Sequence, residues 1–230
     1  MPPPRPRSRH SPVPRYDRCD PVPPDFRGLT VERPPIPPTL IPLPSEFPGE
    51  RILLRPLRAE VAEQAFAAVD ESRDHLRPWV AWVDNQSTVE QTRDYCIRCA
   101  ANWLLRTDLT LGIFDSASGR FLGGTGLHEP DWELRSFEIG YWLRLSAIGH
   151  GYTTDAVLLL RDFAFSQLRA RRLELSCDVR NDPSRRVAER AGFNLEGRLR
   201  NVFLDSRGEP GDYLVFAMTP DDWRIASGNS

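Results

Sequence analysis

The alternation of hydrophobic and polar residues between positions 51 and 223 predicts one domain built from strands and helices. Short apolar runs bounded by turn residues predict strands, and apolar residues three and four positions apart predict helices that bury one face. The elements follow one another in the order β-α-α-β-β-β-α-β-α-β-β, which is typical of a mixed sheet flanked by helices. The expected strands span 51–56, 109–114, 121–127, 135–143, 172–179, 195–203 and 212–218, the expected helices span 59–70, 87–105 and 182–191 with one more after Gly151, and a last turn spans 221–223.

Residues 137–193 form the stretch around which the rest of the chain is arranged. An apolar strand pattern leads through a polar loop into the turn Gly149-His150-Gly151, and a helical pattern begins directly after it. The first turn of a helix has backbone N–H groups without intrahelical partners, and these attract anions. The glycine turn, with the hydroxyl of Thr153 beside it, is therefore a candidate phosphate site, although such turns are also common as plain tight connections.

A second strand and helix repeat this arrangement. The strand 172–179 is followed by Asn181, and a short helix begins near Pro183 and closes at Gly192. Proline near the first helical position and glycine just past the last one are the usual asymmetry of a helix. Two strands that each deliver a helix N-terminus to one end of a sheet create a cleft with polar ends.

The segments EIGYWLR, GHGYTTDAV, LRDFAFSQL and RRLELSCDVRNDPSRRVAERAGFNLEGRLR resemble the GCN5-related N-acetyltransferase (GNAT) superfamily, specifically its ribosomal-protein-alanine acetyltransferase-like branch. The resemblance extends from about Arg51 to Trp223. It implies an α/β (α+β) fold with a central mixed, mostly antiparallel sheet of six or seven strands and about four helices. It also implies a bacterial, acyl-CoA-dependent N-acyltransferase that moves an acetyl group from acetyl-CoA to a primary amine, either a protein N-terminus or a small molecule.

The resemblance places acetyl-CoA on the first strand and helix. Its diphosphate is expected on the backbone amides of the glycine turn, and its pantetheine arm on the edge of the preceding strand. This chain has Ser146 and Ile148 where the family often carries amide or basic side chains, so the affinity for the cofactor is less certain than its identity. The expected contacts are Ile148, Gly149, His150, Gly151, Tyr152 and Thr153 at the turn, Ile139, Tyr141 and Leu143 on the strand, and Asn181 beside the sulfur.

Acetyl transfer to an amine needs a base that removes a proton from the ammonium and an acid that protonates the leaving thiolate. By resemblance, Ser184 is the expected acid and Asn181 orients the pantetheine or a water, although both are also ordinary helix-capping residues. Relatives carry a Glu nineteen residues after that serine, where this chain has Phe203. Glu138 is then the expected base, with burial raising its pKa, unless it is simply a solvated residue of an amphipathic strand. Secondary candidates for the base are His128, Glu129 and Asp205.

Three other functions stay open at this stage. Arginines near the cleft could accept the extra carboxylate of succinyl-CoA, which would make the protein an N-succinyltransferase. Loss of the expected Glu fits a non-catalytic acyl-CoA-binding regulatory protein, against which the retained Asn181 and Ser184 count. A nucleotide-binding transferase would need a lysine for the phosphates and carboxylates for Mg²⁺, and the chain has no lysine. The arginines near the cleft that could accept a succinyl carboxylate are Arg77, Arg144, Arg185, Arg198 and Arg200.

Charge and hydropathy limit the partners. A net charge of -2 and a pI near 6.1 give no electrostatic case for nucleic acid. No run approaches the roughly 20 apolar residues that cross a bilayer, and the N-terminus lacks the apolar core of a signal peptide. We therefore expect a cytoplasmic enzyme whose partners are an acyl-CoA and an amine acceptor.

The first 48 residues differ from the rest in composition, because they hold 16 of the 22 prolines. We expect a proline-rich, polyproline-like extended arm over 1–48 and the N-acyltransferase domain over 49–230. The arm is either a flexible tail or is held against the domain or against a neighbouring subunit of a homo-oligomer. The candidate anchors are Tyr16, Phe26, Ile36, Leu40, Ile41 and Leu43.

The four cysteines do not form a disulfide framework in a chain of this size. Cys96 and Cys99 have the spacing of half a zinc site, but no second Cys or His pair follows at ligand spacing. We therefore predict no metal.

Overall fold

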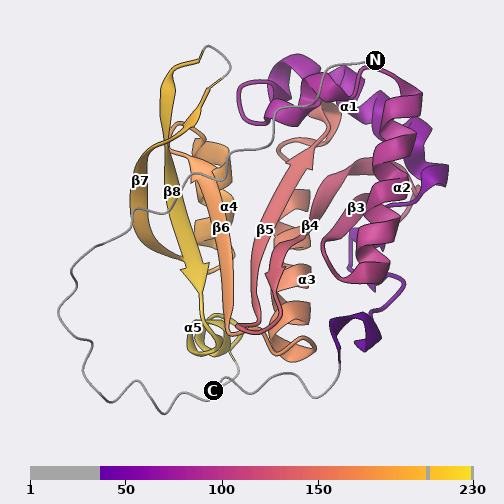
Figure 1. Cartoon of the computed structure of the whole chain (residues 1–230). Coiled ribbons are helices and arrows are strands. Elements are labelled where there is room, and N and C mark those ends of the chain that lie inside the picture. The colour runs from indigo at the N-terminus through magenta and orange to yellow at the C-terminus, as the bar shows by residue number, and fades with distance from the viewer. Residues whose placement is uncertain (1–36, 206–207, 229–230) are drawn as a thin grey trace, which may run out of the picture. The chain divides into compact units, whose positions relative to one another are not determined.

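The computed structural model of the protein describes residues 37–205 and 208–228. Within them, eight strands form one sheet in the order β1-β2-β3-β4-β5-β6-β8-β7, in which β5 and β6 are parallel and all other neighbours are antiparallel (Figure 1). This confirms the mixed, mostly antiparallel sheet. The strands are β1 (Phe47–Pro48), β2 (Ile52–Pro56), β3 (Leu109–Asp115), β4 (Phe121–Asp131), β5 (Ser136–Leu143), β6 (Arg172–Asp178), β7 (Asn194–Leu204) and β8 (Pro210–Met218).

Helices cover both faces of this sheet. The first two, α1 and α2, pack on each other and on β3 and β4, whereas α3 and α4 pack on the opposite face against β5 and β6. The last helix, α5, packs on α3. The two faces of the sheet are therefore covered by separate sets of helices. A cavity that connects the two faces between strands must pass through the sheet. The helices are α1 (Ala62–Leu76), α2 (Val89–Leu105), α3 (Tyr152–Ser166), α4 (Asp182–Arg190) and α5 (Pro220–Ala226).

Three details of the predicted elements need correction. The sheet has eight strands rather than six or seven among the described residues, because the two-residue β1 adds to β2 and is too short to leave a pattern. The helix α2 starts at Val89 rather than at 87, and its N-cap is Thr88, which accepts a hydrogen bond from the backbone N–H of Gln91. The last turn is a capped helix, since Thr219 and Asp222 form a capping box at α5.

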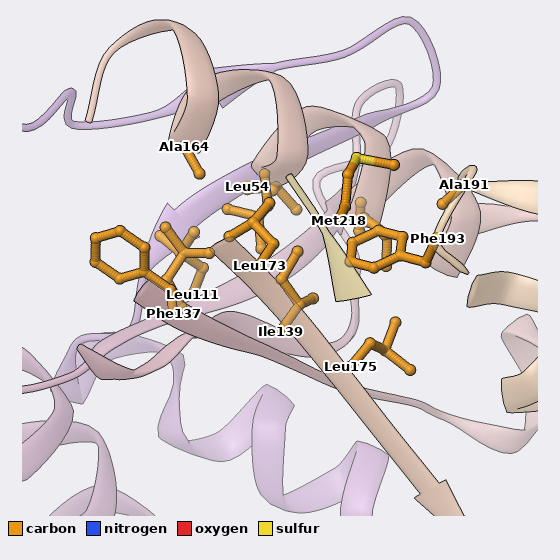
Figure 2. Packing of buried hydrophobic residues seen from close by; sticks show 14 of the residues in the cluster. Leu54, Leu111, Phe137, Ile139, Ala164, Leu173, Leu175, Ala191, Phe193 and Met218 are labelled. Carbon is orange, nitrogen blue, oxygen red and sulfur yellow. The ribbon is translucent and has the colours of Figure 1, made fainter. Parts of the chain in front are cut away.

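The hydrophobic core lies mainly between the sheet and α3 with α4. Figure 2 shows the inward side chains of β5 and β6 gathered with Ala164 of α3 and Phe193. Of the residues of α3 at helical spacing, Ala156, Val157, Leu160 and Ala164 are fully buried, and Phe163 is partly buried. Burial of these side chains, at about 25 cal/mol per Å² of apolar surface, fixes the orientation of α3 and with it the position of its N-terminus.

The described end of the proline-rich segment belongs to the sheet. Phe47 is buried, and Ile41 and Leu43 pack on the main core, while Leu40 is exposed. An Nη2 of Arg106 donates to the backbone oxygen of Ile41 over 2.8 Å. Contacts with the domain therefore begin before position 49. Tyr16, Phe26 and Ile36 lie outside the described residues.

The cysteines and the helices give no sign of a metal or a membrane span where the structure is described. Cys96, Cys99 and Cys177 are buried free thiols, and Cys19 lies outside the described part. No group of three or more His, Cys, Asp or Glu side chains gathers as metal ligands in 37–205 and 208–228. Over the same ranges, none of the helices combines the length and the apolar character needed to cross a bilayer.

Candidate active site

The parallel strands β5 and β6 separate half-way along their length. Residues 136–138 of β5 pair with 172–174 of β6, and the ladder goes no further although both strands continue. Figure 1 shows the two strands side by side at the lower end of the sheet and apart at the upper end. The edge of β5 from Ile139 to Leu143 therefore turns unpaired backbone groups toward the opening. Such an edge can bind an extended ligand as another strand would.

The glycine turn opens the helix that follows β5. Gly149 and Gly151 have φ values of 85° and 83°, a left-handed conformation that side chains other than glycine rarely adopt. The helix α3 begins at Tyr152, so the amides of its first turn have no intrahelical acceptor. Arg51 closes the turn from the side, donating from Nη1 to the backbone oxygen of His150 and from Nε to Asp155. The turn is thus a rigid group of free N–H donors beside a guanidinium.

Tyr152 and Ile148 differ in their surroundings. The ring of Tyr152 packs on the core beneath the turn, with the Arg51 guanidinium 5.5 Å from its centre. Ile148 is exposed, as its place in a loop allows. Thr153 is half-buried in the first turn of α3. The expected turn residues therefore occupy one continuous surface at the N-terminus of the helix.

Ser146 is joined to charged side chains from two other elements. Arg120, at the start of β4, donates from Nη2 to its Oγ over 2.9 Å, and Glu71 of α1 accepts from its N–H and its Oγ. Arg144 also donates to Glu71 through Nε. The hydrogen bonds from Arg144 and Ser146 outweigh burial and lower the pKa of Glu71 to about 2. The guanidinium of Arg120 thus places a positive charge beside Ser146, a position at which the sequence alone indicates only a hydroxyl.

Asn181 caps the helix on which Ser184 contacts Tyr141 of β5. Asn181 caps α4, because its Oδ1 accepts the backbone N–H of Ser184. The hydroxyl of Tyr141 lies 2.8 Å from the Oγ of Ser184 and 3.2 Å from its backbone oxygen. Burial raises the pKa of Tyr141 above its usual value, so this phenol is a neutral hydrogen-bonding group. Its position on β5 and that of Ser184 on α4 bring two expected site residues into contact.

A cavity of about 370 Å³ lies at this opening, and its lining includes residues of both faces of the sheet. On the α3 and α4 side it is lined by Ile139, Tyr141, Leu175 and Ser184, on the face of the main core. The alternation of β4 and β5 places Gly124, His128, Gly140 and Trp142 on the other face, toward α1 and α2. The remaining lining residues are Trp79, Val80, Trp82, Tyr95, Thr110, Thr125, Ser176 and Tyr213.

The comparisons with known proteins agree with this geometry. The sequence model of the acetyltransferase (GNAT) domain matches residues 51–194. The chain belongs to the GNAT superfamily. A Bacillus subtilis relative named as a probable N-acetyltransferase, YjcK, is 33% identical over 178 residues, which cover 76% of this chain and 97% of the relative. The protein is thus an acyl-CoA-dependent N-acetyltransferase that transfers the acyl group to an amine.

Solved structures share the fold of this acetyltransferase. A GCN5-related N-acetyltransferase from Brucella melitensis has a TM-score of 0.70 and 26% identity, over 82% of this chain and 84% of the other. RimL, a ribosomal alpha-N-protein acetyltransferase solved with coenzyme A, has a TM-score of 0.72 over 77% and 99% of the two chains. At 21% identity the second comparison concerns the fold alone.

The carboxylates proposed as bases have different surroundings in this acetyltransferase. Burial raises the pKa of Glu138, and the neighbouring carboxylates of Glu129 and Glu174 raise it further. Glu138 is not among the residues that line the cavity. Glu129 is exposed, and Asp205 forms an ion pair with Arg180. His128 is the one expected candidate whose side chain lines the cavity within the described residues.

The structure also explains the surroundings of Phe203, which stands where relatives carry a Glu, and of the five arginines considered for succinyl-CoA. Phe203 stacks on Tyr213, with ring centres 4.5 Å apart, and so supports an aromatic side chain of the cavity wall. None of the five arginines lines this cavity in the described structure. Four of them form ion pairs with nearby carboxylates, which leaves less of their charge for a succinyl group. These pairs are Arg77 with Asp74 and Asp84, Arg144 with Glu71, Arg185 with Asp182 and Glu189, and Arg198 with Asp212.

Sequence reasoning missed several members of the site. Arg51 and Arg120 reach the glycine turn and its loop from β-strand regions far away in the sequence. Tyr213 and Tyr95 complete the cavity wall. Their residue types carried no local signal, because only the pairing of distant strands brings them together. The glycines at 124, 126 and 140 were an available signal, since side-chain-free positions in adjacent strands leave room for a neighbouring group.

Proposed function

We propose that this acetyltransferase binds acetyl-CoA on the α3 side of the sheet and acetylates a primary amine that enters from the α1 and α2 side. The observation that carries the proposal is the cavity between β5 and β6, whose lining includes residues of both faces of the sheet beside Ser184. A thioester and an amine can meet there without sharing one entrance. Holding the two reactants close together in the correct orientation is a large part of what an enzyme contributes to such a transfer.

The donor side offers the groups that coenzyme A requires. The diphosphate would bind the free amides of residues 148–153, where the α3 dipole favours negative charge. The pantetheine would pair with the open backbone edge of β5 at Ile139, Tyr141 and Leu143. This path leads from the glycine turn directly to Ser184.

Ser184 would protonate the thiolate that leaves. Its hydroxyl is held by Tyr141 at 2.8 Å, and its backbone is held by the Asn181 cap, so the group has a fixed direction. Asn181 would act by fixing this start of α4 and by facing the pantetheine. The role of Glu138 as the base stays a prediction, and the residue is not among those that line the cavity.

The acceptor side has an aromatic wall. Trp79 and Trp82 follow α1, and Trp82 packs edge-on against Trp142 with ring centres 5.5 Å apart. Aromatic rings hold apolar groups and also attract ammonium ions through their faces. A primary amine attached to an apolar or aromatic body therefore fits this wall, and a protein N-terminus that begins with such a residue is one form of it.

A turnover screen tests the proposal. Thiol release from acetyl-CoA is followed with N-terminal peptides, aromatic monoamines, polyamines and aminoglycosides as acceptors, and succinyl-CoA is run in parallel. We expect amine-dependent thiol release with acetyl-CoA, fastest for acceptors with an apolar or aromatic group. Acetyl-CoA that binds without turnover on any amine would indicate the non-catalytic alternative, and faster turnover of succinyl-CoA would overturn the choice of donor.

A further inference from the structure

The side chains of Asp108 and His128 form a pair at the cavity wall that the predicted mechanism does not use. The Nδ1 of His128 lies 2.8 Å from an Oδ of Asp108. Asp108 precedes β3, and the hydroxyl of Thr110 donates to its other carboxylate oxygen. Burial alone would raise the pKa of Asp108, but the hydrogen bonds from His128 and Thr110 lower it below its usual value. The ionised carboxylate therefore accepts from Nδ1–H, and in the neutral imidazole the lone pair then lies on Nε2.

Two glycines make room for the imidazole. Gly126 and Gly140 are cross-strand partners in β4 and β5, and they lie on the same face as His128. A Cβ at Gly126 would come within 2.9 Å of the His128 Nε2, and one at Gly140 within 3.2 Å. The ring thus lies over the two glycines, beside the cavity that Gly140 and His128 both line.

The backbone after His128 is strained in a way that fixes this direction. Glu129 has a φ of 46°, and the pairing of β4 with β5 shifts register between His128 and Asp131. Bulges of this kind often occur beside active sites, where they aim a side chain, and a non-glycine residue with positive φ is uncommon. The bulge ends the regular strand directly after His128.

We infer that His128 is the general base of the acetyl transfer and that Asp108 is its positioning residue, an inference that rests on the proposed function. Nε2 of His128 takes one proton from the substrate ammonium, which frees the nitrogen lone pair. The nitrogen then bonds to the thioester carbon, and the carbon–sulfur bond breaks as Ser184 protonates the thiolate. The second nitrogen proton replaces the one that Ser184 gave, and His128 passes its proton to water, so one proton is released for each amide formed.

Other titratable groups surround this pair and enter its pH behaviour. Glu138 and Glu129 are neighbouring carboxylates, and Glu138 is the cross-strand partner of His128. Tyr95 of α2 and Tyr213 of β8 line the same cavity. Burial raises the pKa of both phenols, so they stay neutral near pH 7. The raised pKa of the partly buried Glu138 means that this carboxylate can also contribute to the pH profile, so the Glu138 variant belongs in the comparison.

The test compares His128→Gln with Glu138→Gln and with the matched control His75→Gln, an exposed histidine of α1. For His128→Gln we expect kcat to fall by roughly 10²–10³-fold, the usual range for loss of a general base, with acetyl-CoA affinity unchanged by calorimetry. In the pH profile of kcat/KM, the inflection on the acidic side should be absent from His128→Gln. His75→Gln should match the unaltered enzyme.

Asp108 is tested by its effect on that inflection. Asp108→Asn should lower kcat by about tenfold and shift the acidic inflection to lower pH, and Asp108→Glu should recover part of the loss. A purely structural role would leave the inflection in place. Full activity of His128→Gln, or its loss in Glu138→Gln alone, would overturn the inference while leaving the proposed function intact. An unaltered enzyme that binds acetyl-CoA but never releases thiol would overturn both.

Discussion

The two sides of the cavity contribute different kinds of groups. On the side of α3 and α4, the coenzyme would contact mostly backbone: the open edge of β5 and the amides after Gly149. On the side of α1 and α2, the wall consists of side chains from five strands and two helical regions, with Trp82 and His128 among them. A backbone site can bind the same cofactor in many proteins, whereas a side-chain wall can change its acceptor by substitution. We therefore expect the donor to be common to the family and the acceptor to be specific to this chain.

The largest effect should come from blocking the backbone site. Gly151→Glu places a side chain in a left-handed position, 3.2 Å from the Arg51 guanidinium, and sets a carboxylate where the diphosphate should bind. We expect acetyl-CoA affinity to fall by about 100-fold or more. Calorimetry measures it, and Gly228→Glu is the control, since its φ of 67° imposes the same strain in open space. Unchanged affinity in Gly151→Glu would remove the diphosphate from this turn.

A change in the aromatic wall should affect only the acceptor. Trp82→Ala removes one ring of the Trp82–Trp142 pair, and we expect the KM for the best amine to rise by about tenfold. The KM for acetyl-CoA should stay within about twofold. Trp223→Ala, which removes an indole that packs on Phe165 instead, provides the comparison. An equal rise in both KM values for Trp82→Ala would mean that the two sides are not separate.

A smaller effect is expected from the charge that reaches the donor loop. Arg120→Gln removes the guanidinium bound to Ser146, and the KM for acetyl-CoA should rise by about three- to fivefold, because exposed charges act weakly through water. The difference should shrink at high salt, which screens such charges. Steady-state kinetics at two salt concentrations measure it, with Arg98→Gln on α2 as the control. A salt-independent effect would point to altered loop packing instead.

The smallest effect should come from Glu71, which links the two sides by tying the donor loop to α1. Because its folded pKa of about 2 is below the ordinary 4.5, the ionised form stabilises the fold above pH 4.5, and this contribution disappears as pH falls toward 2. Glu71→Gln should lower Tm by about 2–4 °C at pH 7, and the gap should narrow below pH 4.5. Thermal melts across pH check this. A gap that stays equally large from pH 5 down to pH 2 would show that charge is not its cause.

The donor side was predictable from the sequence to a degree that the acceptor side was not. Gly149 and Gly151 predict a turn because only glycine adopts their φ values at little cost. The residues that surround these glycines in space are also their neighbours in sequence. The pairing of His128 with Asp108 depends on the register of β3 against β4 and on a bulge at Glu129. Strand register is a property of the assembled sheet, so no local pattern of residues reveals that pair.

Hydrogen–deuterium exchange with and without acetyl-CoA tests the central claim, that the coenzyme lies along the opening between β5 and β6. We predict new protection in peptides that cover 139–143 and 149–155, where the open strand edge and the first turn of α3 lie. Residues around a second cavity of about 440 Å³, lined by Glu46, Arg58 and Phe114 among others, should exchange as before. Protection there, with none over 139–155, would contradict the placement of the coenzyme.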